Sequence, residues 1–148
     1  MDKYTPEIKD FFGHKPRFNV VLIKGSNKKV NFEELSKELN FQIIDLQKLA
    51  MEGKIELERI DGYSDLLKLL KHISNKITKE GALLLNLDLL LSLLSKKKRK
   101  QFFERALQKT FYKPVIFVTI IFKDEVPDVK HQEFNYAKVL EGGNSHEI

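Results

Sequence analysis

The sequence contains no cysteine among its 148 residues. This excludes disulfide scaffolds, cysteine-ligated zinc, iron–sulfur clusters and thiol catalysis. Glycine and proline are also scarce, at seven and four residues, whereas 11 phenylalanines and four tyrosines indicate a packed core. That composition is not typical of a fibrous or disordered chain. The length suits one domain, which we place at residues 1–141, followed by a flexible tail at 142–148.

Long hydrophobic runs are missing as well. The most apolar stretches are Ala82–Leu94 and Pro114–Phe122, and both are too short to cross about 30 Å of hydrocarbon. The polar segment Met1–Asp10 does not have the pattern of a signal peptide. We therefore expect a cytoplasmic protein with no membrane partner. The net charge of +5, with both signs mixed, permits a phosphate-bearing partner without requiring one.

Short apolar segments alternate with amphipathic ones along the chain. We expect helices from Asn31 to Asn40, from Ser64 to Gly81 and from Ser95 to about Lys109. The segments expected to be strands are rich in β-branched and apolar residues, and they lie at 18–24, 41–46, 82–87, 114–122 and 134–140. This order predicts an α/β three-layer sandwich with a mostly parallel sheet of about five strands.

The first strand-to-helix loop resembles a phosphate-binding loop in its setting, because a hydrophobic strand precedes Gly25 and a helix follows Asn31. The motif G-x-x-x-x-G-K-[ST], laid from Gly25, places Val30, Asn31 and Phe32 at its last three positions. Valine hinders close backbone approach, asparagine neutralises no phosphate charge, and phenylalanine offers no hydroxyl for Mg²⁺. The alternative is an ordinary turn with a helix cap. The candidate nucleotide-binding residues here are Gly25, Ser26, Asn27, Lys28, Lys29 and Asn31.

The strand expected at 82–87 carries the second candidate. P-loop ATPases end such a strand in an acid that holds Mg²⁺ and often follow it with a glutamate that orients water. Asn86 and Leu87 occupy those two positions here, and Asp88 serves only if the strand ends later. The alternative is a buried strand with a polar end. Thr119, in the strand expected at 114–122, is a candidate polar sensor for the same nucleotide, and the equal alternative is an ordinary β-forming residue of that strand.

A run of five cations begins the helix expected after Ser95: Lys96, Lys97, Lys98, Arg99 and Lys100. Cations at a helix N-terminus oppose its dipole, at a cost of about 0.3–1 kcal/mol each when exposed. The run is therefore a candidate nucleic-acid-binding surface, with a plainly solvated face as the alternative. The four histidines lack metal-ligand spacing, so we expect no metal site.

Taken together, the segments 20–25, 82–88, 114–122 and 134–137 have the order and lengths of a minimal P-loop ATPase core of the AAA+/ASCE type, without room for a helical lid. The chain most resembles the BrxF family, the single-domain P-loop components of some BREX phage-defence systems. The resemblance covers most of the chain in layout and lies in the total length, in 83–90 and in Asn135-Tyr136-Ala137. It implies as partners a large ATPase, a phosphatase-like component and the DNA near which they act.

Because both Walker positions are altered at once, the sequence favours a non-catalytic, ATPase-like binding or scaffold component of a DNA-associated defence complex. Such a component requires no cofactor, although ATP or ADP with Mg²⁺ is the ligand that the layout suggests. Two alternatives stay open. One is an active small ATPase that uses Lys28 or Lys29 together with Asp88. The other is a nucleic-acid-binding module that uses the run 96–100.

Overall fold

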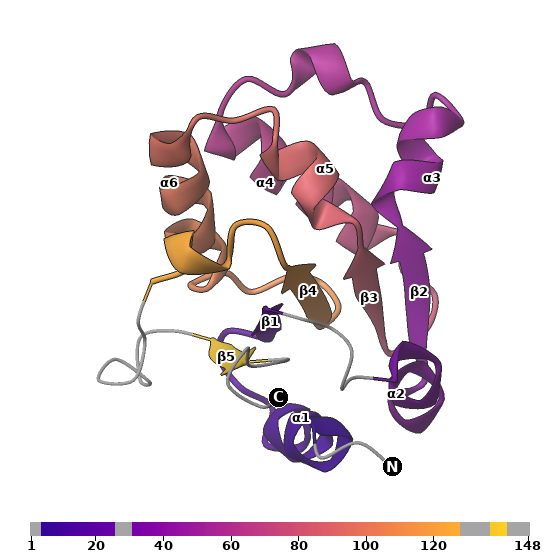
Figure 1. Ribbon diagram of the computed structural model, residues 1–148. Helices are drawn as coiled ribbons and strands as arrows, with labels where there is room; N and C mark the ends of the chain where they lie inside the picture. The colour runs from indigo at the N-terminus through magenta and orange to yellow at the C-terminus, as the bar shows by residue number, and fades with distance from the viewer. Residues whose placement is uncertain (1–3, 26–30, 128–136, 142–148) are drawn as a thin grey trace.

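The computed structural model describes residues 4–25, 31–127 and 137–141. Its elements alternate between helices and strands, with two short 3-10 helices, η1 and η2 (Figure 1). In chain order they are α1 (Tyr4–Gly13), β1 (Val20–Lys24), α2 (Phe32–Leu39), β2 (Phe41–Asp45), α3 (Leu46–Met51), η1 (Leu57–Arg59), α4 (Tyr63–Asn75), β3 (Gly81–Leu85), α5 (Leu87–Leu91), α6 (Lys96–Ala106), β4 (Val115–Thr119), η2 (Lys123–Glu125) and β5 (Lys138–Glu141).

The strands form one all-parallel sheet in the order β2-β3-β4-β1-β5. Val115 of β4 lies opposite Val20 of β1 on one side and opposite Ala82 of β3 on the other, so β4 separates β1 from β3. The central strands are almost continuously apolar because helices cover both faces. The α/β class with a parallel sheet of about five strands is therefore confirmed.

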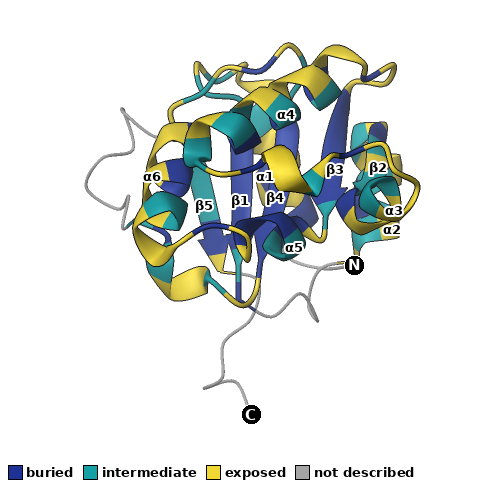
Figure 2. Cartoon of the chain, turned by 90° about the horizontal axis from the view of Figure 1, so that it is seen from above, coloured by how far each residue is buried: buried dark blue, intermediate teal, exposed yellow. Residues whose placement is uncertain are grey.

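Helices cover both faces of the sheet, and its central strands are buried (Figure 2). On one face, α1 and α2 bury Ile8 and Leu35 against β1, β3 and β4. On the other face, α3, α4, α5 and α6 cover the same strands, with Leu66 and Phe102 among the residues that are fully buried. The β1-to-β2 connection therefore runs over one face, and the β2-to-β3 and β3-to-β4 connections run over the other.

The first predicted helix has the expected caps. The side chain of Asn31 accepts a hydrogen bond from the Glu34 backbone N–H at 3.0 Å. Asn40 ends the helix in a left-handed conformation, at φ 54°. These are the roles in which asparagine is favoured at the two ends of a helix.

Other boundaries differ from the prediction. The helix α1 was not expected, although Tyr4, Ile8 and Phe12 lie at helical spacing and contact the α2-side core. Ser64 does not cap α4. Gly62 is the N-cap there, and the Asp65 carboxylate accepts from its N–H at 3.0 Å. Gly81 does not end that helix either, since it is the first residue of β3.

Polar side chains also shorten two strands. The strand β3 ends at Leu85 because Asn86 turns the backbone into the left-handed region, at φ 65°, so that Leu87 begins α5. The strand β4 ends at Thr119 because the Asp88 carboxylate takes the next two backbone N–H groups. The last strand, expected at 134–140, is β5, and residues 134–136 lie outside the described part.

None of the helices in the described ranges combines the length and the apolar character that crossing a bilayer requires.

Candidate functional site

The carboxyl ends of β1, β3 and β4 meet at one edge of the sheet. The chain leaves β1 toward α2 on one face and leaves β3 toward α5 and α6 on the other. In open α/β sheets, a crevice for ligands forms beyond the strand ends where successive connections leave to opposite faces. The topology therefore places a candidate site at this edge, where the sequence predicts it.

Three predicted site residues are linked there by hydrogen bonds. The Gly25 N–H donates to the Thr119 carbonyl oxygen at 3.0 Å. The Thr119 hydroxyl, which is fully buried, donates to Asp88 Oδ1 at 2.5 Å. Gly25 has φ 97°, a conformation that glycine adopts without strain. The ends of β1, β4 and β3 are thus joined into one unit.

The Asp88 carboxylate holds the end of β4. Its Oδ2 accepts from the N–H groups of Ile120 and Ile121, at 2.9 and 3.0 Å, while Oδ1 accepts from Thr119. Two hydrogen bonds fill the acceptor capacity of Oδ2. Asp88 therefore fixes the turn after β4 and presents no free bidentate carboxylate to a ligand.

Asn86 is also committed to a neighbouring strand. Its Nδ2 donates to Asp45 Oδ1 at 2.7 Å, which ties the end of β3 to the end of β2. This bond is the main cause that lowers the pKa of Asp45 below its ordinary value, and the backbone N–H groups of Gln47 and Lys48 add to it. Asp45, which the sequence analysis did not single out, therefore stays anionic and caps α3. The sequence feature that could have identified Asp45 is an acid at the junction between a strand and a helix.

A cleft of about 600 Å³ opens beside these residues, between the start of α2 and the start of α5. Its apolar lining consists of Phe32, Leu85, Leu89, Val118, Ile120 and Ile121, and its polar lining of Gln47, Asn86, Asp88 and Ser92. Within the described residues that line it, no side chain is cationic. Glu33 and Glu34 in the first turn of α2 add negative charge at the end of that helix where an anion would otherwise be favoured.

The described residues do not fit a magnesium–nucleotide. Asn86 carries no charge, and the Asp88 carboxylate is bonded to the end of β4. Leu87, at the position of the glutamate that would orient water, is completely buried and has no basic group. No group of three or more acidic or histidine side chains gathers in the described ranges in a way that could hold a metal ion. Asn31 lies at the start of α2 as its cap. The predicted loop residues Ser26, Asn27, Lys28 and Lys29 lie outside the described part.

The basic run divides into two groups on α6. Arg99 faces inward: its guanidinium pairs with Glu125 at 2.6 and 2.9 Å, donates to the Leu94 carbonyl and lies over the Phe122 ring. Lys98 donates to the Asp61 carbonyl at 2.7 Å. Lys96, Lys97 and Lys100 are exposed. Only these three members of the run present their charge fully to solvent.

The Arg99–Glu125 pair makes the stability depend on pH. The Arg99 guanidinium lowers the pKa of Glu125 from its ordinary value of 4.5, so the pair stabilises the fold above that pH and its contribution is lost as the pH falls through the lowered value. We expect Glu125→Gln to reduce the free energy of unfolding at pH 7 by about 2 kcal/mol, because the side chains are only 15% and 11% exposed.

Urea unfolding at pH 7 and at pH 2 checks this expectation. The difference between the wild type and Glu125→Gln should shrink as the pH falls through the lowered pKa of Glu125, because a protonated glutamate carries no more charge than the glutamine that replaces it. Asp124→Asn, on the exposed neighbour, should change little at either pH. An equal loss at both pH values would show that the pair does not titrate as described.

Comparisons with known proteins do not assign the site. Neither the scan against family models, nor the search of curated proteins, nor the search of solved structures returns a significant match. The structure itself defines an α/β protein with a parallel five-stranded sheet and a cleft at its carboxyl edge.

Proposed function

We propose that this chain is a non-catalytic domain, similar to P-loop ATPases in layout, that works by binding. It would serve as a scaffold or regulatory component of a multiprotein, DNA-associated complex of the BREX phage-defence kind that the sequence resembles. Three features support the resemblance: a glycine turn after β1, a polar residue at the end of β4, which lies between β1 and β3, and an acid, Asp88, which follows β3 within α5 rather than ending the strand.

One observation carries the non-catalytic part of the proposal. The side chains at the ends of β3 and β4 are bonded to one another and to the backbone rather than left open toward the cleft. Residues that bind Mg²⁺ and orient water in an ATPase need free oxygens aimed at the ligand. Here the same positions join strands β2, β3 and β4, so an ancestral site would survive as a structural brace.

Binding rather than catalysis also agrees with the character of the cleft. Ile120 and Ile121, which line the cleft, are 45% and 73% exposed, and adjacent exposed apolar side chains are a common feature of protein-binding surfaces. Under the proposal, the partners are other proteins of the complex, including a large ATPase and a phosphatase-like component, and DNA.

Steady-state ATP hydrolysis by the purified protein tests this proposal. We expect turnover at the buffer background, unchanged by Lys28→Ala or Lys29→Ala. Lys37→Ala, on the exposed side of α2, controls for the loss of one lysine. Hydrolysis above background that either loop variant abolishes, and that the Lys37 variant keeps, would establish the active small ATPase instead.

A further inference from the structure

The excess positive charge of the protein lies on two neighbouring helices. Together α4 and α6 contain eight Lys and Arg residues but only two acids, Asp65 and Glu104. The whole chain has a net charge of +5, so the remainder is close to neutral. Because α4 and α6 pack against each other on one face of the sheet (Figure 1), their charges form one surface.

A hollow of about 360 Å³ lies between these helices. Its lining consists of Tyr63, Leu67, Arg105, Gln108 and Lys109, which include two cations and no carboxylate. The Arg105 guanidinium lies 6.0 Å from the centre of the Tyr63 ring. The hollow thus combines positive charge, hydrogen-bond donors and an aromatic ring, as phosphate groups with an attached sugar or base require.

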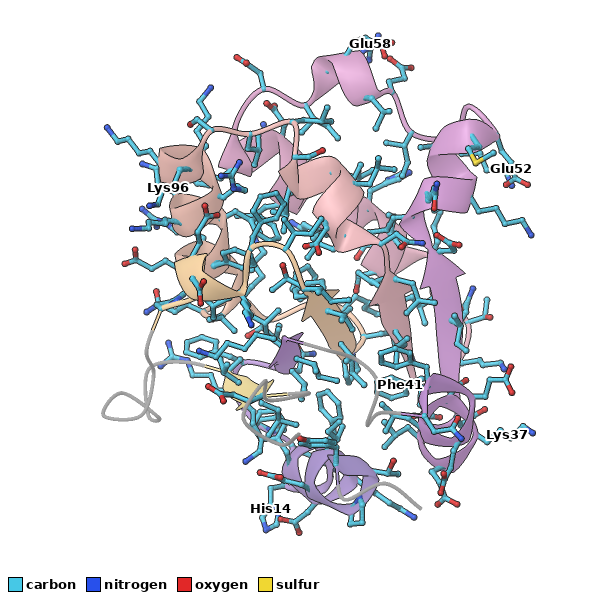
Figure 3. All side chains as sticks on the ribbon, in the orientation of Figure 1. His14, Lys37, Phe41, Glu52, Glu58 and Lys96 are labelled. Carbon is cyan, nitrogen blue, oxygen red and sulfur yellow. The ribbon has the colours of Figure 1, made fainter. Side chains whose placement is uncertain are left out.

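Helical spacing extends the hollow into a stripe. Lys71 follows Leu67 by four residues on α4, and Lys98 precedes Arg105 by seven residues on α6, so each lies on the same side of its helix as the hollow. Lys71 and Arg105 are exposed, and the Lys98 side chain is 42% exposed. In Figure 3, basic side chains project outward from α6 around the labelled Lys96.

The cations at the start of α6 are not favoured by the helix that carries them. Five consecutive cations begin α6, and no acid lies in its first turn, although the helix dipole favours acids there. Among the described residues, Lys98 and Arg99 are the cations of α4 and α6 that have a carboxylate within 4 Å. Lys96 and Lys97 oppose the dipole of α6 without such a partner in that part of the chain, and a bound anionic ligand would offset this cost.

We propose that α4 and α6 form a nucleic-acid-binding surface that holds the phosphate backbone, with Arg105 and Lys109 at its centre. Helices of 13 and 11 residues extend about 20 and 16 Å, which is long enough to follow several successive phosphates. A nucleic acid is favoured over an acidic protein because the hollow places an aromatic ring and two cations together. This deepens the proposed function by naming how a DNA-associated component contacts DNA.

The test is fluorescence anisotropy with a labelled 30-base-pair duplex at 50 to 200 mM salt. The wild type should bind, with an affinity that falls steeply with salt. The double variant Arg105→Gln/Lys109→Gln should bind about tenfold more weakly at 150 mM salt, and its salt slope should be smaller by about 1.8, or 0.9 for each lost phosphate contact. The same titration with a single-stranded oligonucleotide compares the affinities for single-stranded and double-stranded DNA.

The matched control is Lys9→Gln/Lys37→Gln, which removes the same charge from α1 and α2 on the opposite face. It should keep the wild-type affinity and slope, and thermal unfolding should show that both variants are folded. Equal losses in the two variants, or no binding by the wild type at 50 mM salt, would overturn the proposal. So would polyglutamate that binds as tightly as DNA, because it would assign the surface to acidic proteins. Hydrolysis of ATP would contradict only the proposed function and would leave this surface intact.

Discussion

Asp88→Ala is expected to lower the free energy of unfolding by about 3 kcal/mol. The substitution removes all three hydrogen bonds that join the start of α5 to the end of β4. It also leaves the hydroxyl of Thr119 without its acceptor, and this side chain is completely buried. Ile120 and Ile121 are exposed, so their N–H groups can bond to water after the substitution, and most of the loss comes from the buried Thr119 hydroxyl, whose hydrogen bond to a charged group contributes about 1.5–3 kcal/mol. For a chain of this size, Tm should fall by about 6–12 °C.

Urea and thermal unfolding measure this loss directly. Asp124→Ala, which removes an exposed carboxylate from η2, should stay within about 0.5 kcal/mol of the wild type. Replacing an acid whose role is to bind a metal or a nucleotide gives the opposite result, because the substitution relieves repulsion and often stabilises the free protein. An Asp88→Ala variant as stable as the wild type would therefore show that Asp88 is not the brace described here.

Gly81→Ala is expected to destabilise the protein to a similar extent, by about 3 kcal/mol. A Cβ atom at this position would lie 2.5 Å from the Phe41 ring and 2.6 Å from the Pro114 carbonyl oxygen. The ring is buried between the sheet and Phe12, and the carbonyl accepts the Ala82 N–H, so neither can move freely. Overpacking of this kind typically costs 1–3 kcal/mol, and here backbone is among the contacts.

Gly13→Ala provides the matched control. Gly13 is the last residue of α1, and a Cβ atom there would meet nothing within 4 Å. Alanine should leave the stability unchanged or raise it by up to about 1 kcal/mol, because it has the higher helix propensity. Gly81→Ala should therefore lower Tm in a thermal scan in which Gly13→Ala does not. Equal stabilities would mean that β2, β3 and β4 are less closely packed at this end than the structure indicates.

Features of the fold that depend on residues close together in the sequence could be predicted from the sequence. The helix that begins after Asn31 was predictable because its cap depends on residues only three positions apart. The buried strands were predictable because an apolar run of that length needs cover on both faces. The helix α1 was missed because its apolar residues become meaningful only once the strands that they cover are known.

The position of the candidate site could be predicted from the sequence, but the hydrogen bonds between its residues could not. The order of strands and loops brings Gly25, Asp88 and Thr119 to one edge, as expected. That Asp88 would bind the end of β4 could not be read from the sequence, because its partners lie 31 to 33 residues away. For the same reason, the run 96–100 gave no sign that Arg99 would turn inward to Glu125.

Calorimetric titration of the protein with ATP and with ADP, each with and without Mg²⁺ at 150 mM salt, tests the proposed loss of the nucleotide site. That salt concentration suppresses general attraction between a basic protein and a polyanion. Because Asn86 and Asp88 are bonded within the fold, we predict no heat that depends on Mg²⁺. Stoichiometric binding with a micromolar Kd that requires Mg²⁺ would contradict the proposal and would restore a working nucleotide site at this edge of the sheet.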